Sequence, residues 1–336
     1  MKINNRRYIG CKTKLLDFIF QTINEYDIPA PAVFADIFAG TGAVASFFAD
    51  HGYKTIVNDT LYSNVIAYEA WLGSGDVDQY KIQDLLNRLN AINPESLPRN
   101  YFSEVYGGKY YSINDAKKIG YIRDYIEDNR SHFTEREYAC LLASLIYCAD
   151  KIANTVGHFE SYLLRPPVDK GVCLQIIDFP QGTVPADIYN EDANRLVRKI
   201  KCDIAYIDPP YNARQYVNFY HVLENLARWQ KPTEFEGHSM KFKRQDLKSD
   251  YCRGKAPLLM ADLINNFDAR LIVVSYNNTY TAGSESSVNT ISAEQLVEIL
   301  SSKGTVTVKE QAYKTFNAGK TELKGHKELL YVCEVK

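Results

Sequence analysis

A short apolar segment that runs directly into a glycine-rich turn is the feature that most limits how this chain folds. Residues 33–38 are mostly apolar, Gly40-Thr41-Gly42 follows, and an apolar helical segment then continues to Gly52. A second apolar strand is predicted at 54–57, directly after that helix. A strand, a tight turn, a helix and another strand in this order are typical of a parallel sheet covered by helices.

The same alternation returns in the second half of the chain and predicts an α/β fold with a mainly parallel sheet. Residues 73–175 differ, because they carry helical periodicity without strands between the helices. We therefore expect one α/β domain, built from 1–72 and 176–336, with a mostly helical insert at 73–175. The predicted strands are 33–38, 54–57, 174–179, 203–207 and 271–275, with a closing hairpin of 305–309 and 329–334. The predicted helices are 13–26, one that follows the glycine-rich turn and ends at 50–52, one that ends at about residue 71, and 76–92, 113–130, 134–153, 191–201, 217–229 and 292–302.

Composition excludes several classes of protein. With 46% hydrophobic and 24% charged residues among 336, the chain is not disordered as a whole. A formal net charge of -2 excludes a uniformly basic nucleic-acid coat protein but leaves room for a local basic groove. The longest strongly apolar run, 141–149, is too short to span a bilayer, so no membrane contact is expected. Seven scattered cysteines without CxxC spacing favour free thiols in a reducing cytosol, with no metal site.

The glycine-rich turn carries the first candidate site. Asp36 and Phe38 precede Gly40 and Gly42, and Asp59 follows at the end of the next predicted strand. An acidic side chain there accepts hydrogen bonds from ribose hydroxyls. The spacing is not that of a dinucleotide-binding turn, and it suits a nucleoside ligand without a pyrophosphate, such as S-adenosylmethionine. A plain strand-to-helix turn is the alternative.

The second candidate site is the tetrapeptide Asp208-Pro209-Pro210-Tyr211, just past the apolar segment 203–207. Ligands of open α/β sheets bind at this end of a strand. The Asp208 carboxylate and the Pro209 carbonyl can both accept hydrogen bonds from one amino group, and the two prolines hold the backbone rigid. Tyr211 offers a flat face for stacking. This set would position an exocyclic amine of a base as a nucleophile; an Asx-Pro turn is the alternative reading.

Taken together, YIGCK at 8–12, DIFAGTG at 36–42, NEDA at 190–193 and YIDPPYNARQY at 206–216 resemble the D12 class of adenine-specific DNA methyltransferases. The resemblance implies a Rossmann-like S-adenosylmethionine-dependent methyltransferase sheet. It also implies methyl transfer to the N6 amine of a flipped adenine in a specific DNA sequence, leaving S-adenosylhomocysteine, within a restriction–modification system. The motif order is that of the alpha group, which makes 73–175 the expected target-recognition domain. Double-stranded DNA and a separate restriction endonuclease are the expected partners of a monomeric, cytoplasmic protein of prokaryotic or phage type.

The resemblance also assigns individual residues by motif. Asp208, Pro209, Pro210 and Tyr211 would hold the target adenine, and Asn212, Arg214, Gln215 and Tyr216 would continue toward the DNA. Lys12 could equally be a solvated lysine at a helix start, and Asp192 an ordinary helix N-terminal acid. The residues expected to bind the cofactor are Tyr8, Ile9, Lys12, Asp36, Phe38, Gly40, Thr41, Gly42, Asp59, Asp192 and Ala193.

Residues 231–256 are polar and basic, with seven Lys or Arg against four Asp or Glu, and are interpreted as a long loop. Lys241, Lys243 and Arg244 in this loop have charge suited to DNA phosphates. The alternative is an ordinary solvated face. His158 in the insert is either a DNA contact or a structural histidine.

Four other functions can be compared on the sequence alone. An RNA adenine methyltransferase would use the same chemistry. A cytosine-N4 enzyme is disfavoured, because that group typically carries Ser in place of Asp208. A catalytically inactive nucleic-acid-binding module is the alternative from a different class. A dehydrogenase is disfavoured by the glycine spacing.

Overall fold

The computed structural model describes residues 1–179, 183–279, 288–312 and 327–336 of the chain. These residues form two compact units. The helical unit comprises Met1–Ile9, Leu61–Gln181 and Val217–Gln245, and the sheet unit comprises Gly10–Thr60, Gly182–Tyr216 and Asp246–Lys336. The boundaries of the two compact units therefore differ from those of the predicted insert, because residues 61–72 and 217–245 belong to the helical unit. The functional division at 73–175 stays a prediction.

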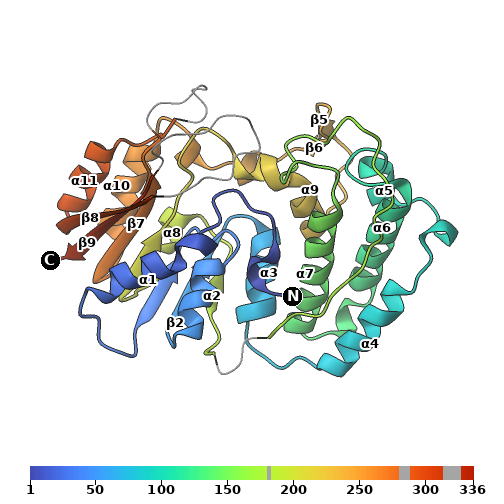
Figure 1. Ribbon diagram of the computed structural model, residues 1–336, viewed down its shortest axis with the longest axis horizontal. Coiled ribbons are helices and arrows are strands. Elements are labelled where there is room, and N and C mark those ends of the chain that lie inside the picture. Colours follow the sequence, from blue (N-terminus) through green and yellow to red (C-terminus); the bar gives the residue numbers. More distant parts are fainter. Residues whose placement is uncertain (180–182, 280–287, 313–326) are drawn as a thin grey trace. The chain divides into compact units, whose positions relative to one another are not determined.

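The sheet unit is built on a seven-stranded sheet with the order β3-β2-β1-β4-β7-β9-β8 (Figure 1). The first five strands in this order are parallel, and β9 is antiparallel to both β7 and β8. The strands are β1 (Val33–Asp36), β2 (Lys54–Asn58), β3 (Asp187–Tyr189), β4 (Ile204–Ile207), β7 (Leu271–Asn277), β8 (Gly304–Ala312) and β9 (Lys327–Val335). The helices are α1 (Leu16–Asn24), α2 (Ala43–Asp50), α8 (Ala193–Leu196), α10 (Ala256–Asn266) and α11 (Ala293–Ser301), with 3-10 turns at Thr13–Leu15, Gln245–Leu247 and Asp250–Cys252.

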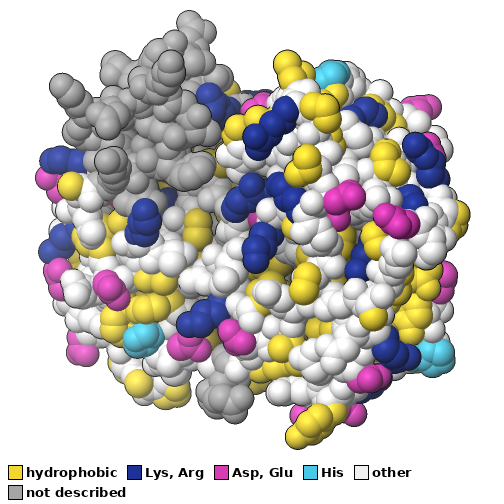
Figure 2. Space-filling view, turned by 45° about the vertical axis from the view of Figure 1, so that its right-hand side comes forward, with side chains coloured by type: hydrophobic (Ala, Val, Ile, Leu, Met, Phe, Trp, Pro, Cys, Tyr) yellow, Lys and Arg dark blue, Asp and Glu magenta, His cyan; other side chains and the backbone are white. Residues whose placement is uncertain are grey.

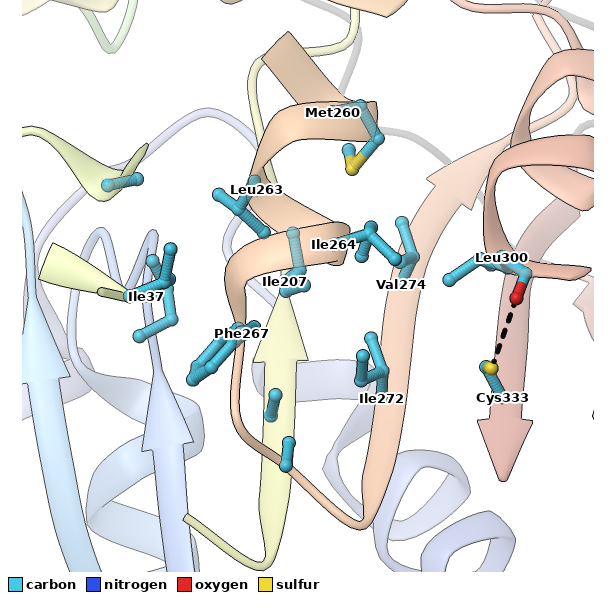
Figure 3. Close-up of a cluster of buried hydrophobic side chains, with 14 of the residues drawn as sticks. Ile37, Ile207, Met260, Leu263, Ile264, Phe267, Ile272, Val274, Leu300 and Cys333 are labelled. Carbon is cyan, nitrogen blue, oxygen red and sulfur yellow. Dashed lines mark hydrogen bonds between the residues drawn. The ribbon is translucent and has the colours of Figure 1, made fainter. Parts of the chain in front are cut away.

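Successive residues of a strand point to opposite sides of the sheet, so the apolar strands place apolar side chains on both faces. Helices cover both faces and bury these side chains. One face packs Phe34, Tyr206 and Val273 against apolar side chains of α1 and α2. The other face packs Ile207, Ile272 and Val274 against α10 and α11 (Figure 3). A parallel sheet needs this double cover, since its strands are apolar on both sides.

The helical unit packs α3 against α7 and α6 against both α5 and α7. Several of its helices begin at side-chain caps, which satisfy amide groups that have no partner within the helix. Thr134 and Glu137 form a capping box at α7, and Ser112 caps α6. The elements are α3 (Tyr62–Leu72), α4 (Gln79–Asn90), α5 (Tyr101–Tyr106), α6 (Ile113–Asp128), α7 (Glu135–Ile152) and α9 (Tyr216–Arg228), with the short strands β5 (Phe235–Glu236) and β6 (Lys241–Phe242) and 3-10 turns at Ile3–Asn5, Pro94–Ser96 and Arg130–His132.

Two buried charged side chains tie α9 to the rest of the helical unit. The Arg123 guanidinium of α6 donates to the carbonyls of Leu226 and Ala227 at the end of α9. The Glu224 carboxylate of α9 accepts the backbone amides of Tyr62 and Ser63, 2.9 Å away, at the start of α3. No helix within the described ranges is both long and apolar enough to cross a membrane.

The α/β prediction is confirmed, with five local differences, one of which is that helix α5 was not predicted. Residues 174–179 form no strand: the backbone of Leu174 bonds Asn90, and that of Gln175 bonds Ser144, so helix side chains take the place of a neighbouring strand. The sheet edge is instead β3. The predicted helix at 191–201 is limited to α8, and α10 was not predicted. Segment 231–256 is not a plain loop, because it contains β5, β6 and two 3-10 turns.

Candidate active site

The central strands β1 and β4 are parallel neighbours, so their carboxyl ends lie at the same edge of the sheet. Asp36 is the last residue of β1, and Asp208 follows the last residue of β4. Strand β2 lies on the other side of β1, so the strand order reverses between β1 and β4. Such a reversal point is where open α/β sheets bind ligands. The two predicted motifs therefore meet at the expected edge.

The glycine turn after β1 is held in shape by Asp59. Gly40 and Gly42 have backbone φ angles of 53° and 74°, a left-handed conformation that favours glycine. The Gly40 amide donates to the Asp59 carboxylate over 3.0 Å. Thr41 is buried, with its hydroxyl 3.5 Å from the sulfur of Cys11. The turn thus places an acidic side chain beside a sharply bent backbone.

Asp36 is a buried carboxylate whose hydrogen-bonding capacity is largely unused, although the Ala45 backbone amide acts to lower its pKa. Its side chain is 1% exposed, and within the described part of the chain no group meets hydrogen-bond geometry with either oxygen. Burial raises its pKa well above the usual range, and the nearby charge of Asp208 raises it further. A buried polar group of this kind is costly unless a partner satisfies it.

The segment after β3 is tied to the end of β2. The Asn58 side chain donates to the carbonyls of Ile37 and Glu191 and accepts the Glu191 amide over 3.0 Å. The Asn190 side chain donates to the Asp59 carbonyl over 2.7 Å. The candidate cofactor residues at 36–42, 59 and 192 are therefore linked through one set of hydrogen bonds.

The remaining cofactor candidates of the sheet unit have structural roles as well. Asp192 caps α8, because its carboxylate accepts a hydrogen bond from the Arg195 backbone amide over 3.1 Å. This is the role of an ordinary acid at a helix N-terminus, which was the alternative for this residue. Ala193 is buried in the core cluster beneath α10. The ring of Phe38 packs edge-on against Tyr251, with centroids 5.1 Å apart.

Lys12, Asp208, Tyr211 and Glu328 form a charged cluster in which Lys12 and Glu328 are buried and Asp208 and Tyr211 are partly buried. The Lys12 ammonium lies 2.7 Å from Glu328 and 3.2 Å from Asp208. The Tyr211 hydroxyl donates to Asp208, receives a hydrogen bond from Lys12, and lies 2.9 Å from the Glu328 carboxylate. Lys12 is therefore not a solvated lysine. The structure brings it together with the predicted tetrapeptide.

Burial and charge act in opposite directions within this cluster. Burial raises the pKa of Asp208 to about 6, although Lys12 works to lower it. Burial alone would lower the pKa of Lys12, but Asp208 and Glu328 together raise it above its ordinary value. Lys12 is therefore charged near neutral pH, whereas Asp208 changes its charge close to that pH.

Glu328 was not predicted as a site residue. It lies near the start of β9, which is otherwise apolar over Leu329–Cys333, and it is 2% exposed. An acidic residue inside an apolar strand is the signal that could have identified it, because buried carboxylates are rare unless paired. Its main partner is far away in sequence, so no local motif contains both residues.

The residues that follow the tetrapeptide have mixed surroundings. Asn212 accepts the Arg214 amide over 3.1 Å, and Arg214 itself is exposed. The Gln215 side chain bonds the backbone of Ser249 at both its nitrogen and its oxygen, over 2.8 Å each. The Tyr216 hydroxyl lies beside Gly10, 3.1 Å from where a β-carbon would be.

Other predicted residues belong to the helical unit. The Tyr8 ring stacks on Tyr220 with centroids 4.6 Å apart, and the Ile9 amide donates to the Tyr220 hydroxyl over 2.7 Å. His158 packs against Phe219 with ring centroids 5.1 Å apart. These contacts show that Tyr8, Ile9 and His158 all pack against the first half of α9.

The basic residues near β6 differ in exposure. Lys243 is exposed and Lys241 is half-buried, whereas Arg244 is 6% exposed and bonds Asn218, Glu236 and the Phe242 carbonyl. On the face seen in Figure 2, Lys and Arg side chains lie in small groups among acidic and apolar ones. Lys241 and Lys243 are therefore better placed than Arg244 to contact a phosphate.

Comparison with known proteins agrees with the candidate motifs of this site. The family described as D12 class N6 adenine-specific DNA methyltransferase matches residues 8–312. The modification methylase StsI of Streptococcus sanguinis is 35% identical over 93% of this chain and 49% of its own length. The type II methyltransferase M.NlaIII of Neisseria lactamica is 32% identical over 97% of this chain and 98% of its own. M.FokI of Planomicrobium okeanokoites is 33% identical over 81% of this chain and 44% of its own.

This chain therefore spans about half the length of the StsI and FokI relatives and nearly the whole of the NlaIII relative. Methyltransferases of this kind use S-adenosylmethionine, and their substrate is DNA. Because the family match covers most of the chain and includes both candidate motifs, the chain belongs to the D12 class of N6 adenine-specific DNA methyltransferases.

Proposed function

We propose that this chain transfers a methyl group from S-adenosylmethionine to the N6 amine of adenine in a specific DNA sequence, as the modification enzyme of a restriction–modification system. The observation that carries the proposal is the position of Asp208. Its carboxylate follows β4 at the sheet edge where the glycine turn begins, beside the buried Asp36. Family membership and the names of the relatives support DNA as the substrate.

Asp36 supports a cationic ligand at this edge, because its two oxygens are buried without a hydrogen-bond partner among the described residues. The ammonium of a methionine moiety has the charge and donors that such a carboxylate lacks. The Asp59 carboxylate would accept ribose hydroxyls, and Gly40 and Gly42 would let the backbone approach the ligand. When bound, S-adenosylmethionine supplies an electrophilic methyl group.

The adenine-holding residues would act by position and charge. In the proposal, the Asp208 carboxylate and the Pro209 carbonyl each accept one hydrogen of the N6 amine. Both acceptors pull the amine out of conjugation, so its lone pair becomes available for attack. Tyr211 would stack on the base. The target adenine must leave the duplex first, because its amine is otherwise enclosed by the base stack.

Residues 73–175 would supply much of the target recognition, and Arg214, Lys241 and Lys243 would contact the phosphate backbone. A separate restriction endonuclease would complete the system. An RNA adenine methyltransferase or an inactive binding module would share the Asp208 site, and the experiment separates these alternatives.

The test is expression in a host that lacks adenine methylation, followed by single-molecule sequencing of the host DNA. We expect N6-methyladenine in one sequence context. Asp208→Asn should remove it while the protein still folds and binds S-adenosylmethionine. Asp268→Asn is the matched control, since the Asp268 side chain is exposed and pairs with the exposed Lys201.

Unmethylated DNA recovered with a folded, cofactor-binding wild-type protein would reject the DNA enzyme. Methylation of the host's RNA in the same cells would then favour the RNA alternative. Methylation that persists in Asp208→Asn would reject the assigned mechanism while leaving the activity.

A further inference from the structure

Glu328 gathers three polar groups around one buried carboxylate oxygen. Its Oε1 accepts hydrogen bonds from the Lys12 ammonium over 2.7 Å and from the Ser275 hydroxyl over 2.9 Å. It also lies 2.9 Å from the Tyr211 hydroxyl, whose single proton is donated to Asp208. The side chain is 3% exposed. Hydrogen bonds to an ionised acceptor are stronger than neutral ones, and a buried carboxylate requires them.

The topology explains how Glu328 reaches the active edge. Strand β9 runs antiparallel to β7, and Glu328 is paired with Asn277, the last residue of β7. The beginning of β9 therefore lies where β7 ends, and β7 is the parallel neighbour of β4. A reversed strand thus places an acidic side chain at the edge that carries Asp208.

We propose that Glu328 is a positioning residue for methyl transfer: it holds Lys12 so that the Asp208 carboxylate stays available to the adenine amine. This inference rests on the proposed function. The Lys12 ammonium is nearer to Glu328, at 2.7 Å, than to Asp208, at 3.2 Å. Without the Glu328 charge, Lys12 would pair with Asp208 alone and compete with the amine for that acceptor.

The same geometry fixes the direction of a pH effect. The groups that face Asp208 are Lys12 from the segment before α1, Tyr211 beside it, Glu328 from β9, Asp36 from β1 and Tyr206 from β4. Burial raises the pKa of Asp208 to about 6, Lys12 lowers it, and Glu328 raises it. Removing the Glu328 charge should therefore lower the pKa of Asp208, and closer pairing with Lys12 should lower it further.

The experiment compares Glu328→Gln with Glu334→Gln, which removes the same charge from an exposed position of the same strand. Single-turnover methylation of DNA is measured from pH 5 to 9 at saturating S-adenosylmethionine. For Glu328→Gln we expect a rate at pH 8 lower by about tenfold and an acid limb displaced to lower pH. Glu334→Gln should match the wild type in both respects.

A merely structural role would lower the rate at every pH without moving the acid limb, and that result would overturn the inference. An unchanged rate and limb would overturn it as well. If Glu328→Gln does not fold, Glu328→Asp supplies the test. Glu328→Asp keeps the negative charge but moves the carboxylate away from Lys12, because its side chain is shorter. The methylation rate should therefore fall, while the acid limb of the pH profile stays near its wild-type position. An unchanged rate would count against the inference.

Failure of the proposed function is recognised separately, because the wild-type protein would then methylate no DNA at any pH. In that case the carboxyl-carbon NMR signal of Asp208, assigned by its loss in Asp208→Asn, decides the inference without activity. Its titration midpoint should be lower in Glu328→Gln than in the wild type. An equal midpoint would overturn the inference.

Discussion

The Lys12 ammonium lies 3.2 Å from the Asp208 carboxylate. This contact joins the YIGCK motif near the start of the chain to the tetrapeptide Asp208-Pro209-Pro210-Tyr211. Lys12 is 5% exposed, so the pair is largely shielded from water and salt. The pairing decides how Asp208 titrates, since burial and the Lys12 charge act on it in opposite directions. The charges of Lys12 and Asp208 at this edge of the sheet therefore act on each other and have to be considered together.

The rate of methyl transfer should decrease as the pH falls below about 6. The pKa of Asp208 is raised to about 6 by burial, and only the ionised carboxylate accepts the amine hydrogen in the proposed mechanism. The rate should therefore be full above that pH and fall about tenfold for each pH unit below it. Single-turnover rates between pH 4.5 and 8 measure this limb. A rate independent of pH down to 4.5 would contradict the role of Asp208.

Asp59→Ala should weaken S-adenosylmethionine binding by about tenfold to a hundredfold. A charge-assisted hydrogen bond contributes about 1.5–3 kcal/mol, and the substitution also frees the Gly40 amide that Asp59 holds. Isothermal titration calorimetry measures the dissociation constant directly. Asp50→Ala, at an exposed position at the end of α2, is the control and should leave the affinity unchanged. Equal affinities of the two variants for S-adenosylmethionine would show that Asp59 does not bind the cofactor.

The double variant Lys241→Ala and Lys243→Ala should weaken DNA binding and make it less dependent on salt. Each phosphate contact that is lost reduces the slope of log affinity against log salt by about one, so the expected reduction is about two. Fluorescence anisotropy from 50 to 300 mM salt measures the slope. Lys54→Ala with Lys201→Ala removes two exposed lysines of the sheet unit and serves as the charge-matched control. An unchanged slope in the test variant would place both lysines on an ordinary solvated face.

Arg123→Ala should lower the free energy of unfolding by about 3–5 kcal/mol. The side chain is 1% exposed and bonds two carbonyls of α9, the Tyr138 hydroxyl and Glu127, so its removal leaves buried acceptors without a donor. Urea unfolding followed by circular dichroism gives the difference. Arg99→Ala breaks an exposed ion pair with Glu104 and should cost less than about 1 kcal/mol. Similar costs for both variants would show that Arg123 is dispensable for α9.

The sequence identified the sheet and brought the candidate motifs to one edge of it, because both depend on local patterns. Apolar runs marked β1, β2, β4 and β7, and candidate residues followed β1, β2 and β4 directly. Parallel strands carry their polar ends to the same edge, so two motifs distant in sequence could be expected to meet. That expectation needed no knowledge of side-chain contacts.

The missed features depend on tertiary partners. Leu174 and Ile177 are apolar and buried, as in a strand, but side chains of α4 and α7 satisfy the neighbouring backbone. Helix α10 begins with Pro257 in its first turn, which also suits the end of a loop. Glu328 gains its role from Lys12, a residue near the other end of the chain. Such pairings become visible only when the strand order is known.

The single carboxamide of Asn58, which bonds Ile37 and Glu191, has a consequence for cofactor affinity. Three chain segments that follow β1, β2 and β3 are fixed to one another before any ligand arrives. Ordering a loop during binding would consume part of the interaction energy, about 1–2 kcal/mol for each residue immobilised. If these segments bind the cofactor as proposed, Asn58 shifts that entropic cost from the binding step to the folding step, and the ligand would meet loops that are already preorganised.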